Sequence, residues 1–152
     1  MPKSFQVLRG NYTARIDSKG RLKVPTLFRR YVEDKYGSAL YLTSLTGDCV
    51  RVYPMPEWEA IEQRLALLPS MDPARRKFLD RTNYYGQQSL MDSQGRVLIH
   101  PLVRKSAAVV GDVAVLGYLT YLEVWELDKF QQRLLSDPYT AEDEAAIARL
   151  GI

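Results

Sequence analysis

One short motif occurs twice in the chain, as Asp-Ser-Lys-Gly-Arg at residues 17–21 and as Asp-Ser-Gln-Gly-Arg at residues 92–96. Apolar, β-prone residues flank each copy on both sides. This arrangement is typical of a β-hairpin whose tight turn is followed directly by an arginine. The repetition predicts that the chain consists of two related halves.

Asp17 and Asp92 are suited to bracing these turns. An aspartate at the start of a turn accepts hydrogen bonds from backbone N–H groups two residues on, which here belong to Lys19 and Gln94. The glycine that closes each turn suits the left-handed conformation found in a type I turn followed by a G1 bulge. We therefore expect two rigid loops.

Arg21 and Arg96 would leave these loops in fixed directions. A guanidinium group is planar, has five donors and matches phosphate oxygens or a guanine edge with two parallel hydrogen bonds. The motif therefore favours nucleic-acid binding. The alternative is that each arginine simply pairs with the aspartate of its own turn, since Asp-x-x-Gly hairpins are common.

Length and composition favour a protein with one hydrophobic core. The 152 residues suffice for one domain or for two small halves that share a core, and 46% of them are hydrophobic. No apolar run reaches the length of about 18 residues that spans a bilayer, and the N-terminus lacks the apolar segment of a signal peptide. The single Cys49 excludes an intrachain disulfide and a cysteine-cluster metal site, and we expect it to pack as a small hydrophobic strand residue. These features predict a soluble, cytoplasmic protein without metal or other cofactor.

The net charge of +3 is unevenly distributed along the chain. Residues 1–30 contain eight cationic residues and one acidic residue, whereas residues 123–152 contain seven acidic and three cationic residues. This asymmetry indicates a basic face for a polyanion and an acidic end kept away from it, although a charge run is more often a solvated surface.

The first hairpin is predicted to have one apolar and one basic face. Tyr12, Ala14 and Ile16 alternate with polar residues, which indicates a strand packed on one side. The basic residues expected on the opposite face are Arg15, Arg21 and Lys23. We expect a partner to bind there.

The rest of the first half completes a predicted β-β-α-β-β unit. Pro25 stops the second strand and begins a helix that Gly37 ends, and two β-prone runs follow at residues 39–43 and 49–53. A helix containing Trp58 comes next, and Asp72 and Pro73 begin another. The cationic residues of that second helix, which would contact DNA phosphates or simply be solvated, are Arg75, Arg76, Lys77 and Arg81.

The second half repeats this order. It predicts a hairpin from residues 84–91 and 97–99, a helix from Pro101 to Gly111, and strands at 113–116 and 118–125. A helix at Phe130 and a short acidic helix capped by Thr140 are expected to follow.

The second hairpin is less basic than the first, because Gln94 replaces Lys19 and Leu98 replaces Lys23. If one hairpin dominates binding, we expect it to be the first.

Several segments resemble the MraZ family of bacterial transcriptional regulators. They are the two Asp-x-x-x-Arg turns, Arg9-Gly10, the run Gly-Arg-Leu-Lys-Val-Pro at 20–25 and Tyr-Pro-Met-Pro-Glu-Trp at 53–58. The resemblance covers roughly residues 8–135 and is specific.

The resemblance implies a mostly β fold with short helices. Its type is the pseudo-twofold swapped-hairpin β-barrel of the AbrB/MazE/MraZ group, built from two internal β-β-α-β-β repeats with peripheral helices. The expected parts are a first AbrB-like repeat at 8–58, a helical linker at 59–83, a second AbrB-like repeat at 84–130 and a C-terminal helical tail at 131–152.

The resemblance also implies binding to double-stranded DNA at direct repeats upstream of the protein's own operon, the division and cell-wall gene cluster. It implies a ring-shaped homo-oligomer in the cytoplasm, associated with the nucleoid, that needs no small-molecule substrate. The residues expected to form the DNA-binding site are Arg15, Asp17, Lys19, Arg21, Lys23, Asp92 and Arg96.

Three other classes of function compete with this one. An enzyme is not expected, because His100 is the single histidine and neither a Walker-type phosphate loop nor a nucleophile elbow is present. A stronger rival is a protein-interaction module of antitoxin type that uses the same barrel and binds a protein through its acidic tail. An RNA-binding surface built on some of the ten tyrosines is the third, although no RNP-like spacing occurs.

Overall fold

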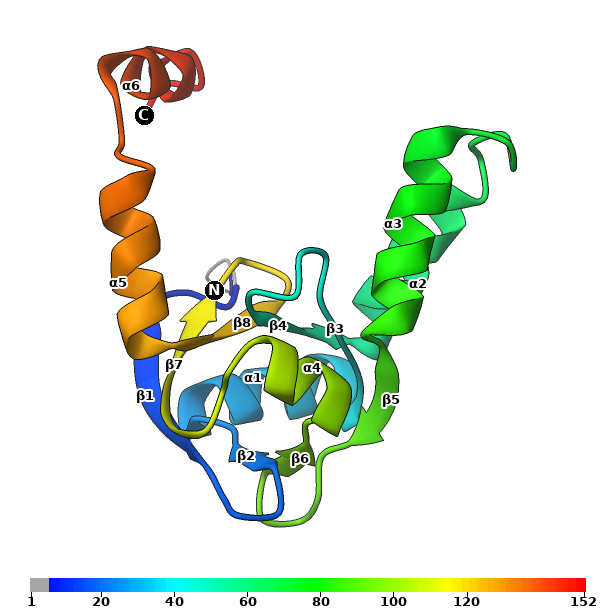
Figure 1. Cartoon of the computed structure of the whole chain (residues 1–152), viewed down its shortest axis with the longest axis vertical. Coiled ribbons are helices and arrows are strands. Elements are labelled where there is room, and N and C mark those ends of the chain that lie inside the picture. The colour runs from blue at the N-terminus through cyan, green and yellow to red at the C-terminus, as the bar shows by residue number, and fades with distance from the viewer. Residues whose placement is uncertain (1–5) are drawn as a thin grey trace, which may run out of the picture.

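The computed structural model describes residues 6–152, and residues 1–5 lie outside the described range. Pairs of strands alternate with one or two helices along the chain (Figure 1). The strands are β1 (Asn11–Ile16), β2 (Arg21–Lys23), β3 (Ala39–Thr43), β4 (Val50–Pro54), β5 (Gln87–Leu90), β6 (Arg96–Leu98), β7 (Gly111–Gly117) and β8 (Leu122–Glu126). The helices are α1 (Thr26–Tyr36), α2 (Met55–Leu65), α3 (Pro73–Tyr84), α4 (Pro101–Ser106), α5 (Leu127–Ser136) and α6 (Ala141–Ala148).

The strands form a single antiparallel sheet in the order β5-β3-β4-β8-β7-β1-β2-β6. The strands at the two ends of this order, β5 and β6, are consecutive in the chain and are joined by the second turn. The sheet therefore curls into a nearly closed barrel.

The two halves of the chain interlock within this barrel. β1 pairs with β7, β2 with β6, β3 with β5 and β4 with β8, so each of these pairs joins one strand from each half. The mostly β, swapped-hairpin architecture with short helices is thereby confirmed.

The register shows the internal symmetry of the barrel. In the β2–β6 pair, Leu22 lies opposite Val97, its counterpart 75 residues along the chain. Arg21 pairs with Leu98. Their counterparts in the other half, Arg96 and Lys23, pair with each other in the same way. The β2–β6 ribbon therefore lies on the pseudo-twofold axis and carries one strand from each half.

Aliphatic side chains from both halves fill the barrel. Leu22, Val50, Val97 and Val124 from the central strands are fully buried. The helices α1 and α4, which cross the middle of the molecule in Figure 1, add further residues to the same core. These residues are Phe28, Val32 and Val103, and Ala107, directly after α4, joins them. The core fixes which side chains of β2 and β6 point outward.

The helix α3 is longer than predicted and the strand after it is shorter. The predicted strand at 84–91 begins at Gln87, because α3 continues through Tyr84. The hydroxyls of Tyr41 and Thr43 donate to the backbone oxygen of Thr82, which ties the last turn of α3 to β3. These contacts outweigh the β propensity of the tyrosines that follow.

The helix α4 is shorter than predicted. It ends at Ser106 rather than at Gly111, because Ala107 and Val109 are both buried in the core. Ala108 lies between them with a φ of +56°, which turns the chain out of the helix. Gly111 instead begins β7.

The strand predicted at residues 118–125 begins at Leu122. Residues 118–121 form a turn in which the Tyr118 N–H donates to the oxygen of Tyr121. The rings of Tyr118 and Tyr121 stack on each other, and Tyr121 also stacks on Tyr53. Aromatic stacking and an isolated β-bridge between Leu119 and Leu8, rather than a continuation of β8, therefore hold these residues.

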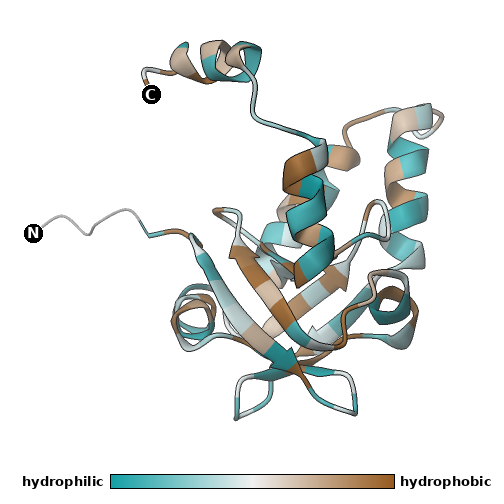
Figure 2. Ribbon diagram, turned by 60° about the vertical axis from the view of Figure 1, so that its left-hand side comes forward, coloured by the Kyte–Doolittle hydropathy of each residue, from teal (hydrophilic) through white to brown (hydrophobic). Residues whose placement is uncertain are grey.

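The helices α2 and α3 rise from one side of the barrel, and α5 leads to α6 on the other side (Figure 1). Both groups lie at the end opposite to the two motif turns, as the turned view also shows (Figure 1, Figure 2). Within residues 6–152, no helix is long and apolar enough to cross a membrane.

Candidate nucleic-acid interface

The two motif turns have the same backbone geometry. The N–H of Asp17 donates to the oxygen of Arg21 and the N–H of Gly20 to the oxygen of Asp17, at 3.0 Å each. Residues 92–96 make the same two bonds at 2.9 and 3.0 Å. Gly20 and Gly95 have φ values of +84° and +76°. The predicted turn, closed by a left-handed glycine, is confirmed in both copies.

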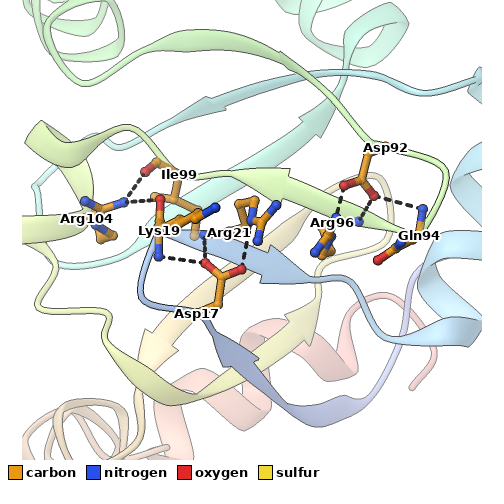
Figure 3. A network of polar contacts seen from close by, with 8 residues as sticks. All are labelled: Asp17, Lys19, Arg21, Asp92, Gln94, Arg96, Ile99 and Arg104. Atoms are coloured by element: carbon orange, nitrogen blue, oxygen red, sulfur yellow. Dashed lines mark hydrogen bonds and ion pairs between the residues drawn. The ribbon is translucent and has the colours of Figure 1, made fainter.

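The aspartate of each turn holds the loop from inside (Figure 3). One oxygen of Asp17 accepts the backbone N–H groups of Lys19 and Arg21, and Asp92 does the same for Gln94 and Arg96, all at 2.9 Å. Hydrogen bonds to the charged form favour it, so the backbone N–H of the arginine, more than any other group, lowers the pKa of each aspartate below its ordinary value. Both carboxylates are therefore ionised at neutral pH.

The arginine of each turn pairs with its own aspartate. Arg21 Nε lies 2.8 Å from Asp17 Oδ2, and Arg96 Nε lies 3.0 Å from Asp92 Oδ2. The side chains of Arg21 and Arg96 remain 31% and 29% exposed, so neither is sealed in the barrel. Among the described residues, none accepts a hydrogen bond from their terminal nitrogens. The aspartate thus orients the guanidinium group and leaves its outer edge for a ligand.

The β2–β6 ribbon brings both arginines onto one surface. Leu22 and Val97 face the core, which places Arg21, Lys23 and Arg96 on the outer side. Lys23 lies opposite Arg96, and its Nζ donates to the backbone oxygen of Gln94 in the second turn. The residues predicted from the two halves therefore meet on a single ribbon.

The remaining predicted cations flank this ribbon. Arg15 lies at the end of β1 with its side chain 77% exposed, and its Nη1 is 3.6 Å from Asp112 on β7. Exposed ion pairs of this kind contribute about 0 to 1 kcal/mol, so Arg15 can leave Asp112 to bind another anion at little cost. Lys19 is exposed at the tip of the first turn.

Two further arginines, which the sequence did not single out as site residues, support the turns from the opposite half. Arg29 on α1 donates from Nη2 to the backbone oxygen of Ser93 at 2.7 Å. Arg104 on α4 donates from Nη1 to the oxygens of Ile99 at 3.1 Å and Lys19 at 3.5 Å (Figure 3). The 75-residue spacing of Arg29 and Arg104 matches that of the two motifs, and this repeat was the available signal.

These arginines pack closely on the turn glycines. A methyl group added at Gly20 would overlap the guanidinium of Arg104, and one added at Gly95 would come within 2.6 Å of Arg29 Cδ. Each half therefore needs a glycine in its turn, for the backbone conformation and for the arginine of the other half.

The basic cluster of α3 is separate from this surface. Arg76 pairs with Asp80 at 3.8 Å, and Arg75 donates to the oxygen of Leu68. Because α3 rises at the far end of the barrel, these residues and the turns do not share one face (Figure 1). A solvated helix accounts for this cluster better than a common DNA surface does.

Other kinds of site find little support in the described residues. Cys49 lies one residue before β4, and its burial raises the pKa of the thiol to about 12, so it packs as a small hydrophobe. His100 is the residue before α4. No group of three or more potential metal ligands occurs within residues 6–152.

Comparison with known proteins agrees with the fold and its repeat. The family model described as "MraZ protein, putative antitoxin-like" matches residues 7–81 and 86–150. The chain is 50% identical to the "Transcriptional regulator MraZ" of Acidobacterium capsulatum over 146 residues, covering 96% of this chain and all of that protein. The protein of the same name from Koribacter versatilis is also 50% identical, with the same coverage. The one from Klebsiella pneumoniae (strain 342) is 36% identical over 86% of this chain and 87% of its own length.

Proposed function

This chain belongs to the MraZ family, and on that premise we propose that it is a sequence-specific, DNA-binding transcriptional regulator. The β2–β6 ribbon and its two turns form the proposed DNA-binding surface. The observation that carries the proposal is the presentation of two braced guanidinium groups, Arg21 and Arg96, on one narrow two-stranded ribbon.

The dimensions of the ribbon fit this role. The major groove of B-DNA is wide enough for a two-stranded β-ribbon, and arginine is the most common side chain to bind guanine there. Since Asp17 and Asp92 already hold Nε of each arginine, little side-chain freedom is lost when the outer nitrogens bind a base.

The proposed roles divide by position. Arg21 and Arg96 bind base edges, while Asp17 and Asp92 orient them. The residues proposed to contact phosphates are Arg15, Lys19 and Lys23, which surround the ribbon. Phosphate contacts fix the register on the duplex, and base contacts select the sequence.

We further propose an operator of direct repeats upstream of the protein's own operon, the division and cell-wall gene cluster. One ribbon buries little surface and binds weakly. A ring-shaped homo-oligomer would engage several repeats together, and linked sites raise the overall affinity without new contacts when their spacing agrees. The proposed location is the cytoplasm, in association with the nucleoid.

The proposed division of labour along the chain follows the repeats. Residues 8–58 and 84–130 form the interlocked DNA-binding barrel, 59–83 the helical linker, and 131–152 a tail outside the DNA-binding surface.

A gel-shift experiment tests the proposal. Labelled DNA from immediately upstream of the gene is compared with shuffled DNA of the same composition at one salt concentration, because salt alone changes such affinities strongly. We expect tighter binding to the upstream DNA and a steep fall in affinity as salt rises. Equal affinity for both duplexes would contradict sequence-specific regulation.

A second candidate is a protein-interaction module, which the antitoxin-like description of the family favours. Its binding element would be the acidic α6, none of whose residues is buried. Deleting residues 137–152 separates the two functions. DNA binding that survives the deletion supports the regulator, whereas loss of a protein partner with no DNA preference supports the module.

A further inference from the structure

The outer face of the β2–β6 ribbon carries two rows of side chains with different chemistry. In one row Lys23 lies opposite Arg96. Arg15 belongs to the same row, because Ile16 pairs with Leu22 and the next residues on the two strands, Arg15 and Lys23, therefore lie side by side. This row is entirely cationic. In the other row Arg21 lies opposite Leu98.

Leu98 lies in the place that Lys23 occupies in the first half, and it is exposed beside Arg21. Its relative exposure is 50%, and Leu90, the counterpart of Arg15, is 71% exposed. Ser89 Oγ is 3.4 Å from the backbone oxygen of Leu98, which links β5 to β6 at this point. The second row therefore combines one guanidinium with an exposed apolar edge.

We propose that Leu98 is a specificity-determining residue that contacts the C5-methyl group of a thymine close to the base bound by Arg21. The inference rests on the proposed DNA-binding function. The thymine methyl is the apolar group that the major groove offers to a protein. Paired strands lie about 4.8 Å apart, so Arg21 and Leu98 reach base pairs within one or two steps of each other.

The exchange of Lys23 for Leu98 also gives the ribbon a direction. A perfectly twofold ribbon would contact the two sides of a site alike and would match a palindrome. With a cationic row on one side and a mixed row on the other, each subunit binds DNA in one orientation. Subunits arranged head to tail would then match direct repeats, whereas subunits related by a twofold axis would match inverted ones.

Uracil substitution tests this contact. A duplex from the upstream DNA is made with each thymine replaced in turn by deoxyuridine, which removes the 5-methyl group and leaves base pairing intact. For the wild-type protein we expect at least one position where the dissociation constant rises about fourfold, because the contact of Leu98 with one buried methyl group is lost. For Leu98→Ala the same duplex should bind as well as the unmodified one.

Two matched variants complete the experiment. Lys23→Ala removes the counterpart side chain and should weaken all duplexes while keeping the uracil effect. Leu98→Lys restores the first half's residue and should lose the uracil effect. Thermal melting checks that each variant is folded, as the exposure of Leu98 and Lys23 leads us to expect.

The outcomes distinguish the two claims. If the wild-type protein prefers upstream DNA but no uracil position distinguishes it from Leu98→Ala, the thymine contact is wrong and the regulator proposal stands. If it has no preference for upstream DNA, both are wrong.

Discussion

The two motif turns have nearly the same internal hydrogen bonds, but they receive different contacts from the opposite half of the chain. Both have the same aspartate bracket, left-handed glycine and Arg–Asp pair. Each turn also accepts one backbone N–H from the other half, Val24 on Gly95 and Ile99 on Gly20. The second turn, however, receives two side-chain donors from the first half, Arg29 on Ser93 and Lys23 on Gln94. The first turn receives one, a 3.5 Å contact from Arg104 to Lys19.

From this difference we expect the two turns to contribute unequally to the proposed DNA binding. Lys19 at the tip of the first turn is exposed, and the two strands of the same hairpin carry the exposed Arg15 and Lys23. The second turn has Gln94 at its tip and leucines at the positions of Arg15 and Lys23. We therefore expect the first hairpin to supply most of the charge and the second to supply a rigid, partly apolar edge.

Replacing one turn arginine at a time tests this inequality most strongly. We expect Arg21→Ala to weaken binding to the upstream DNA by about 1 to 3 kcal/mol and to relax specificity, because a base contact is lost. Arg96→Ala should lose less, since Lys23 lies opposite Arg96 and keeps a cation at that place, whereas the residue opposite Arg21 is Leu98. Fluorescence anisotropy on upstream and shuffled duplexes measures both. Equal losses for the two variants would remove the inequality, and an equal loss of Arg21→Ala on both duplexes would remove its base-binding role.

Alanine at the turn glycines addresses stability. We expect Gly20→Ala and Gly95→Ala each to lower the free energy of unfolding by about 1 to 2 kcal/mol, the usual penalty of a left-handed conformation for a residue with a Cβ. Gly95→Ala should be the more harmful, because its methyl group meets Cδ of Arg29 rather than the mobile end of a side chain. Urea denaturation measures this, with the exposed Ser18 and Ser93 mutated to alanine as controls. A loss as large in the controls would show that the glycine conformation is not the cause.

The supporting arginines should show a smaller difference in the same direction. A single hydrogen bond contributes about 0.5 to 1.5 kcal/mol and weakens as it lengthens. Arg29→Ala loses bonds of 2.7 Å to Ser93 and 2.8 Å to Glu33, and should therefore destabilise more than Arg104→Ala, which loses bonds of 3.1 and 3.5 Å. Hydrogen exchange at the amides of residues 93–95 and 18–20 reports each turn separately. We expect faster exchange in the turn of the half that does not carry the mutation, and the reverse pattern would refute the reciprocal support.

Acid should destabilise both turns to a similar extent, because their aspartates accept the same hydrogen bonds. The folded-state pKa of Asp17 and of Asp92 is lowered by the backbone N–H of its arginine. A lowered pKa gives stability that is complete above the ordinary carboxyl value of 3.8 and is lost as the pH falls below it. Asp17→Asn and Asp92→Asn should therefore each make stability less dependent on pH below about 4. The free energy of unfolding, measured from pH 6 to pH 2, checks this. If it falls below pH 4 as steeply in both variants as in the wild type, the prediction is contradicted.

Much of the barrel and of the site could be predicted from the sequence, because turns and alternating strands are local. Asp17, Gly20 and their counterparts predicted the turn backbone, and Pro25 and Gly37 predicted the ends of α1. Which strand lies beside which is not local. The interlocking of the two halves came from family resemblance, and the particular pairing of β2 with β6 was not predicted.

The errors and omissions have the same origin. Tyr84 joined a helix because Tyr41 and Thr43 hold its last turn, and α4 ended early because Val109 is needed in the core. Arg29 and Arg104 were recognisable as a repeated pair. That each serves the other half's turn follows only from the interlocked topology.

The interlocked strand order has a consequence for biosynthesis. While the ribosome has released only the first repeat and the linker, β1, β2 and β3 still await neighbours that have not been translated. Pairing over such long sequence separations is slow and exposes strand edges until it is complete. The ribbon is therefore assembled only after β6 has emerged, so a nascent chain that terminates before β6 lacks the surface proposed to bind DNA.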